Sequence, residues 1–180
     1  MIIYKNSNIN KKFKRGVVAI GNFDGLHFGH QKVIKQSREK AKKNKLKFGV
    51  VTFEPVPVMF FNRNIKNHRI NSLKQKIIGL KKLKLDFLKI IKFNKKFSKQ
   101  SPKNFIKNII YKDLNSKFIF VSNNFKFGNK RKGNVNLLKK FSSKYNYSLK
   151  KISPLKYKGK IISSTRIRKS LQNGSLDLAN

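Results

Sequence analysis

The sequence has 180 residues, which suits one ordinary domain with a real hydrophobic core. Its 45 Lys and Arg against 6 Asp and Glu give a formal net charge of +39, but 38% hydrophobic residues, with 16 Phe in patterned segments, favour a folded chain over a disordered one. No apolar run could span a membrane, no secretory signal is recognisable and Cys is absent, so we expect a cytoplasmic protein without membrane partners, disulfides or thiol chemistry.

Strands and helices are predicted to alternate along the chain, because short apolar runs alternate with segments of helical periodicity. In chain order, the expected elements are a strand at Val17–Gly21, a helix from about Gly29 to Lys43, a strand at Lys47–Phe53, a long structured loop over Glu54–Asn71, a helix over Ser72–Leu85, a strand at Phe87–Ile91, a helix from Ser101, a strand at Lys117–Val121, a helix carrying Leu137, Leu138 and Phe141, strands at Tyr147–Ile152 and Lys158–Ile162, and a helix from Ser164 that ends near Gly174.

The helix over Ser72–Leu85 has the clearest signals. Ser72 and Gln75 form a capping-box pattern at its start. Its apolar residues recur on one face, at Leu73, Ile77, Leu80 and Leu83. This pattern indicates a helix that packs one side against the core.

The fold class follows from the alternation. Several predicted strands are apolar on both faces, which favours an α/β fold with a mostly parallel sheet and helices on both faces, in a single domain over residues 1–180. In such sheets ligands bind at the carboxyl ends of the strands. The two most unusual segments are expected at such ends, one after the strand from Val17 and the other after the strand from Lys158.

The first unusual segment places His27, Gly29 and His30 between the first strand and a helix. Two His three residues apart lie on one side of a helix turn, and Gly29 leaves room for a phosphate near the free N–H groups of the helix. Asn22 and Asp24 are suited to ordering the preceding turn. Zinc binding is an alternative, but no Cys and no third nearby ligand complete the set. Two ordinary surface His would leave the glycine unexplained.

The second segment, Ile162–Arg168 (ISSTRIR), combines hydroxyl groups, a helix start and two Arg. An ordinary helix cap with solvated Arg is one interpretation. The same hydroxyl and guanidinium donors at a helix start also suit a triphosphate.

These segments carry a resemblance to a known family. Gly21–His30 (GNFDGLHFGH) resembles the first signature of the HxGH nucleotidyltransferases, and Ile162–Arg168 resembles the second. Thr52–Pro57 (TFEPVP) and Val121–Gly128 (VSNNFKFG) are similar to two further segments of one branch, the FMN adenylyltransferase (FAD synthetase) domain of bacterial bifunctional riboflavin kinase/FAD synthetases. The resemblance implies a Rossmann-like nucleotidyltransferase fold and transfer of AMP from ATP to FMN, giving FAD and pyrophosphate.

The resemblance also implies roles for individual residues. His27 and His30 are the expected catalytic residues, stabilising charge on the α-phosphate of ATP. The expected ATP-binding residues are Gly21, Asn22, Phe23, Asp24, Gly29, Ser163, Ser164, Thr165, Arg166 and Arg168. The expected flavin-binding residues are Phe53, Pro55, Phe61, Asn124 and Phe127, although any single Phe among them has an alternative interpretation as a core residue. Mg²⁺ is expected to come with ATP and to be held mainly by its phosphates and water, with no metal-binding residue assigned.

Two departures from the family pattern bear on activity. Val56 stands where the family usually has His, so a phosphate contact by that imidazole is missing or is supplied by a Lys. Ser122 and Asn123 replace the usual Gly and acidic residue beside the expected flavin site.

Other functions stay open from the sequence alone. A related nucleotidyltransferase with another phosphorylated acceptor would share the first motif. The net charge of +39 also suits a degenerate remnant that binds nucleic acid, yet only 7 of the 45 basic residues are Arg and the Lys are spread along the chain, which favours compositional drift. No riboflavin kinase domain is expected within this sequence, so riboflavin phosphorylation is not predicted for it.

Overall fold

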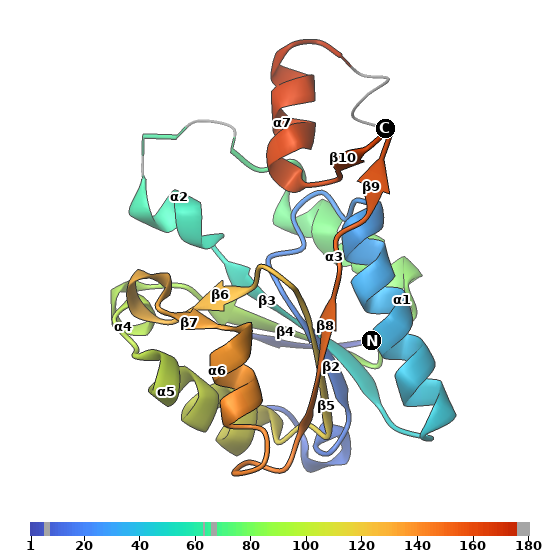
Figure 1. The fold of residues 1–180 in the computed structure, drawn as a ribbon, viewed down its shortest axis with the longest axis vertical. Helices are drawn as coiled ribbons and strands as arrows, with labels where there is room; N and C mark the ends of the chain where they lie inside the picture. Colours follow the sequence, from blue (N-terminus) through green and yellow to red (C-terminus); the bar gives the residue numbers. More distant parts are fainter. Residues whose placement is uncertain (6–7, 63, 66–67, 176–180) are drawn as a thin grey trace.

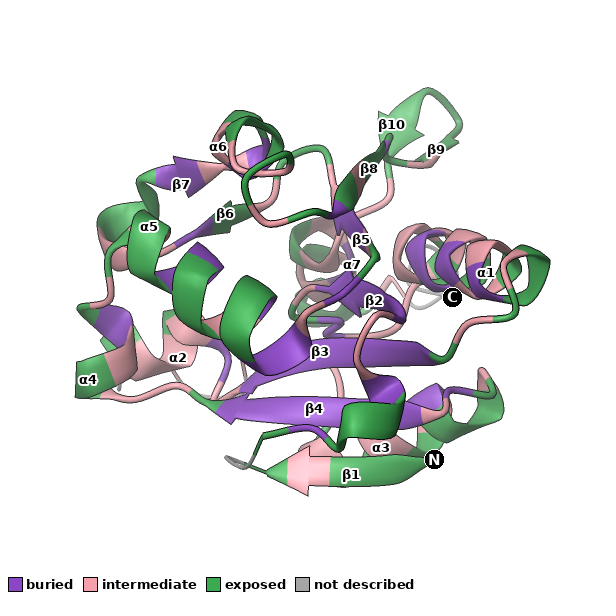
Figure 2. Ribbon diagram, turned by 90° about the horizontal axis from the view of Figure 1, so that it is seen from below, coloured by how far each residue is buried: buried purple, intermediate pink, exposed green. Residues whose placement is uncertain are grey.

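A six-stranded parallel sheet forms the centre of the computed structural model, which describes residues 1–5, 8–62, 64–65 and 68–175. Its strands, in spatial order, are β1 (Ile2–Lys5), β4 (Phe87–Lys92), β3 (Phe48–Glu54), β2 (Val17–Ile20), β5 (Phe118–Ser122) and β8 (Ser148–Ile152). Figure 1 shows the sheet at the centre of the molecule, and Figure 2 shows its strands in this order. All five neighbouring pairs are parallel. The predicted α/β class with a parallel sheet is confirmed.

Helices cover both faces of this sheet. Successive side chains in each strand point to opposite faces, so each strand contributes to the core on both sides. In β2, Val17 and Ala19 pack into one core cluster, whereas Val18 and Ile20 pack into the other. The first cluster lies under α1 (Phe28–Lys43) and α3 (Leu73–Lys82). The second lies under α5 (Pro102–Phe105), its π-helical continuation η2 (Ile106–Leu114) and α6 (Val135–Lys140). The central strands are accordingly buried on both sides (Figure 2).

Helix starts agree with the sequence signals. Ser72 and Gln75 form the predicted capping box before α3, and Leu80 on its inner face is fully buried. Ser101 caps α5 through the N–H of Asn104. The last helix, α7 (Ser164–Gln172), begins after Ser163, whose hydroxyl accepts from the N–H of Arg166.

The structure also contains elements that the sequence patterns did not predict. The edge strand β1 is short and largely exposed, so its residues show no burial pattern. The predicted loop over Glu54–Asn71 contains a short helix, α2 (Pro57–Phe61). The remaining small elements are η1 (Lys11–Phe13), α4 (Lys95–Ser98), η3 (Asn129–Arg131), and the paired strands β6 (Lys126–Phe127) and β7 (Gly133–Asn134).

One predicted strand was wrong in its placement. Instead of joining the sheet, Lys160–Ile161 forms β10, which pairs antiparallel with β9 (Lys156–Tyr157) in a separate hairpin. All four residues of the pair are exposed, including the apolar side chains of Tyr157 and Ile161, and the hairpin forms no ladder with the six-stranded sheet. The hairpin turns at Lys158 and Gly159, which both have positive φ. The second motif therefore follows a hairpin and not a strand of the sheet.

Candidate active site

The loop that follows β2 carries the first motif and is tied to two other elements. The backbone carbonyl of Asn22 accepts two hydrogen bonds, one from the Thr52 hydroxyl on β3 and one from the Lys76 ammonium on α3, each at 3.0 Å. Phe23 is fully buried next to it. Because both donors lie in regular elements of the fold, the start of the motif has a fixed position.

His27 and His30 lie together at the first turn of α1. Their ring centroids are 3.7 Å apart with an interplanar angle of 21°, and Phe23 packs edge-on against His30. His27 is the N-cap residue, and its Nδ1 accepts from the backbone N–H of His30 at 3.4 Å. In the neutral ring this leaves Nε2 as the donating nitrogen. The predicted placement of both His on one side of the helix turn is confirmed.

Burial sets the protonation of these rings. It lowers the pKa of His27, although the nearby carboxylate of Asp24 opposes the change. For His30, burial is again the largest cause, and repulsion by His27 and by the Lys76 ammonium adds to it, which lowers the pKa to about 3. Both imidazoles are therefore neutral at pH 7 and can each donate one N–H. The Nδ1 of His30 is buried without a hydrogen-bond partner in the described part of the chain.

The second motif lies directly against the first, although about 135 residues separate them in sequence. The Ser164 hydroxyl donates to the backbone carbonyl of Asp24 at 2.9 Å, and the guanidinium of Arg168 lies 3.7 Å from the Asp24 carboxylate. A Cβ on Gly29 would come within 3.6 Å of the carbonyl oxygen of Ile162. Figure 1 shows α7 and the preceding hairpin beside the first turn of α1. The predicted histidine and hydroxyl–guanidinium groups thus converge.

Asp24 is the residue that joins these segments. It is only 3% exposed, and its carboxylate accepts from the backbone N–H groups of Ile70 and Asn71 while it pairs with Arg168. Arg168 also donates to the carbonyl of His68 at 2.9 Å. Thr165 is exposed and Arg166 is half-buried on the same helix. The Asp24 carboxylate thus joins the first motif to the segment before α3 and to α7.

The expected flavin-binding residues lie near the carboxyl ends of β3 and β5, but their side chains differ in access. Phe53 and Phe127 are buried in the same core cluster. Phe61 is 66% exposed and packs against Phe60 and Phe93. Asn124 is exposed, and its side-chain oxygen accepts from the Ser122 hydroxyl at 2.8 Å.

Pro55 and Val56 lie beside this region, directly after β3. Pro55 follows a cis peptide bond and is half-buried. Val56, which replaces the family's usual His, is buried before α2 and provides no side-chain cap. Of the aromatic side chains in the expected flavin set, Phe61 is therefore the accessible one.

Comparison with known proteins decides the family. The sequence profile of the FAD synthetase family matches residues 9–166. This chain belongs to the FAD synthetase family. Bifunctional riboflavin kinase/FMN adenylyltransferases are similar to it: that of Buchnera aphidicola subsp. Schizaphis graminum is 43% identical over 96% of this chain and 55% of its own length, that of Haemophilus influenzae 35% over 96% and 56%, and that of Escherichia coli K12 32% over 91% and 52%. The chain spans about half the length of these relatives.

A solved structure supports the same architecture. A crystal structure described as a macrolide-efflux protein from Streptococcus pneumoniae superimposes with a TM-score of 0.85 at 26% identity, covering 99% of this chain and 60% of the other. Within the described ranges of the present chain, no helix has the length and apolar character that a membrane crossing requires.

The family's motifs did not reveal all charged residues of the site. Lys76 is 2% exposed and reaches the Asn22 carbonyl from α3. Arg69 pairs with Glu54 at the end of β3 and also donates to the sulfur of Met59. A signal for Lys76 was present in the sequence, because Lys76 falls on the same helical face as Leu73, Ile77 and Leu80, where a charged residue is unusual.

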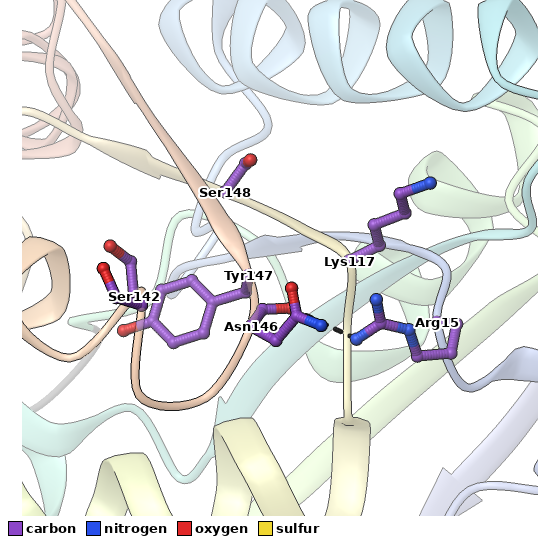
Figure 3. A pocket seen from close by; sticks show the side chains of 7 residues that line it. Arg15, Lys117, Ser142, Asn146, Tyr147 and Ser148 are labelled. Atoms are coloured by element: carbon purple, nitrogen blue, oxygen red, sulfur yellow. Dashed lines mark hydrogen bonds between the residues drawn. The ribbon is translucent and has the colours of Figure 1, made fainter.

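The described part of the chain has cavities both away from the motifs and beside the first one. One of about 220 Å³ lies at the amino ends of β5 and β8, lined by Arg15, Lys117, Ser142, Ser143, Asn146, Tyr147 and Ser148 (Figure 3). It therefore lies at the edge of the sheet opposite the motifs. The other, of about 420 Å³, runs along α1 from Phe28 to Arg38. Among the residues described, His and acidic side chains form no cluster of three that would suit a metal ion.

Proposed function

We propose that this chain transfers AMP from ATP to FMN. A phosphate oxygen of FMN attacks the α-phosphorus of ATP, the bond from that phosphorus to the bridging oxygen breaks, and pyrophosphate leaves as FAD forms. The observation that carries this proposal is the convergence of the His27–His30 pair with the Ser163–Arg168 segment through Asp24. The family to which the chain belongs supports the choice of reaction.

The chain's own groups supply positioning and fixed electrostatics. The neutral rings of His27 and His30 donate N–H groups to the phosphoryl oxygens on which negative charge develops. Free N–H groups at the start of α1 add to this field, and the Arg166 side chain and the Thr165 hydroxyl are the expected triphosphate contacts from α7. The attacking phosphate already carries negative charge at pH 7, so no general base and no covalent enzyme intermediate are required.

Magnesium enters this proposal as part of the nucleotide substrate. The two carboxylates nearest the site are engaged with arginines, Asp24 with Arg168 and Glu54 with Arg69. No group of three ligands is present in the part of the chain that the structure describes. These residues do not fit a resident metal site, so we infer that Mg²⁺ is held by the phosphates of ATP and by water.

The aromatic residues at the ends of β3 and β4 support a flavin as the acceptor. Phe61 is largely exposed and packs edge to face with Phe60 and Phe93, which gives an apolar surface on which an isoalloxazine can pack. Asn124 adds an exposed amide for hydrogen bonding. Phe53 and Phe127 support this surface from the core and are not expected to stack on the flavin directly.

The decisive experiment incubates the purified chain with FMN and Mg-ATP and separates the flavins. FAD together with an equal amount of pyrophosphate is expected. Pyrophosphate release with another phosphorylated acceptor, but not with FMN, would identify a related nucleotidyltransferase instead. A protein that forms no product from any acceptor but binds duplex DNA with a steep salt dependence would support the nucleic-acid-binding alternative.

A further inference from the structure

Lys76 is a buried lysine for which the described residues provide no carboxylate partner. Its side chain reaches from α3 toward the loop after β2, and its Nζ donates to the Asn22 carbonyl at 3.0 Å. Of the residues that the structure describes, none places a carboxylate oxygen within 4.0 Å of this ammonium. An ammonium removed from water normally needs a closer counter-charge, so the position of Lys76 calls for an explanation.

A second buried lysine in the described part of the chain shows the usual solution. Lys89 on β4 is 4% exposed, and its ammonium lies 2.5 Å from the carboxylate of Asp113 on the opposite face of the sheet. That pair lies on the face of the sheet covered by η2, away from α3, and compensates its own charges. Lys76 and Lys89 are therefore a matched pair of buried ammonium groups, of which only Lys76 faces the motif loop.

Charged groups from several elements surround Lys76. Burial lowers its pKa, and Arg69 adds to this, whereas the carboxylates of Asp24 and Glu54 raise it. His30 on α1 faces the ammonium as well. Each of the two carboxylates is already paired with an arginine, so Lys76 adds positive charge to a region that is close to neutral. Such an excess of positive charge is suited to a site that receives anionic substrates.

We propose that Lys76 is a positioning residue of nucleotidyl transfer: together with the Thr52 hydroxyl, its ammonium holds the Asn22 carbonyl and so fixes the loop that leads into His27 and His30. The carbonyl receives one donor from β3 and one from α3, which ties the loop to both elements. The charge of Lys76 also disfavours protonation of His30. This inference rests on the proposed function, because it assigns Lys76 to that same site.

The test uses the absence of Cys from the natural sequence. In Lys76→Cys the new thiol is unique, so it can be alkylated in denaturant and the protein refolded. Aminoethylation restores an ammonium on a side chain of the original length. Carbamidomethylation instead adds a neutral amide that can still donate a hydrogen bond. Lys89→Cys, treated in the same way, is the control for loss of a buried ammonium elsewhere.

We expect unmodified Lys76→Cys to lose about 10–100-fold in kcat for FAD formation, the effect of a lost hydrogen bond from a charged group, with a smaller change in KM for ATP. Aminoethylation should restore most of the rate, and carbamidomethylation should not. Lys89→Cys should unfold at lower denaturant concentration but keep its kcat. Full activity of unmodified Lys76→Cys, equal rescue by the neutral amide, or the same loss of kcat in Lys89→Cys would each overturn the proposal.

A second measurement does not depend on enzymatic activity. The chain has three His, so NMR titration of histidine-labelled protein resolves His30 individually. Its pKa of about 3 should rise in Lys76→Cys and fall again after aminoethylation. An unchanged His30 pKa would overturn the electrostatic part of the proposal. If the wild-type chain made no FAD but His30 responded as expected, the proposed reaction would fail while the interaction between Lys76 and His30 stood.

Discussion

At the scale of single residues, His30 has surroundings that favour the uncharged ring. The ring stacks on His27, contacts the edge of Phe23 and faces the ammonium of Lys76. A neutral imidazole in such a place is a fixed donor that undergoes little rearrangement when charge develops on a phosphoryl group. Its Nδ1 is buried without a partner among the described residues, so Nε2 is the ring nitrogen left to donate to a substrate oxygen.

Removing this donor should slow the chemical step. For His30→Ala we expect turnover of FMN and Mg-ATP to FAD to fall by about 100-fold or more, the usual effect of losing one oxyanion donor. His27→Ala should give a loss of similar size. Steady-state rates at saturating substrates, with circular dichroism as the check on folding, measure this. Near-normal rates in both variants would remove the histidines from the mechanism.

The same burial makes the stability of the protein depend on pH. Because the pKa of His30 is about 3 in the folded chain and about 6.5 when exposed, the unfolded state binds the additional proton as pH falls below about 6.5. The contribution of His30 to the free energy of unfolding should therefore be constant above pH 7 and decrease from pH 6.5 toward pH 4. Urea titrations at several pH values should show a shallower decrease in His30→Leu. An equal slope in both proteins would contradict the assigned cause.

At the scale of elements, α7 is positioned mainly by polar contacts. Ile167 is its one buried residue among those described, while Ser164 and Arg168 contact the backbone carbonyls of Asp24 and His68. A helix held in this way can be loosened from the site without disrupting the sheet. Its attachment is therefore expected to affect substrate binding, and loss of the pair between Arg168 and the buried Asp24 carboxylate should also lower stability.

Arg168→Gln tests this attachment. The substitution removes the cation that pairs with the buried Asp24 carboxylate, so α7 should be held less firmly against the first motif. We expect kcat/KM for ATP to fall by about 10-fold or more, as for loss of a charged hydrogen bond. The melting temperature should fall as well, because the Asp24 carboxylate stays buried without its cation. Lys169→Gln, an exposed change in the same helix, is the control. An equal effect of the two substitutions would show that general charge, and not the contact to Asp24, matters.

The periodicity of apolar residues within each element decides which elements the sequence could predict. The central strands and α1 were predictable because burial on both faces or on one helical stripe leaves a clear apolar period, as at Val17–Ile20. The edge strand β1 and the hairpin of β9 and β10 bury little, so their residues carry no such period. The two motifs could be found from their residues, but their contact through Asp24 depends on long-range packing. Lys76 was missed because its role depends on which carbonyl lies opposite it.

At the scale of the whole molecule, the charge of +39 acts on folding and on substrate capture in opposite senses. Repulsion among 45 basic side chains, opposed by 6 acidic ones, destabilises the folded chain. The same positive field attracts ATP and FMN, which are both anions. The four described ion pairs each involve one of the few carboxylates, so most of the Lys side chains contribute to this field without a nearby counter-charge.

Added salt should therefore raise stability and lower catalytic efficiency together. Screening acts over about 10 Å at 0.1 M ionic strength, which weakens both the internal repulsion and the attraction of distant substrate. Between about 20 and 200 mM NaCl, we expect a higher Tm by scanning calorimetry and a lower kcat/KM for ATP. The value of kcat itself should stay nearly unchanged, because the groups in the site are buried. Measurements at constant free Mg-ATP separate screening from metal competition. If kcat/KM stayed constant while Tm rose, the field would affect folding alone, and the abundance of Lys would have no part in substrate capture.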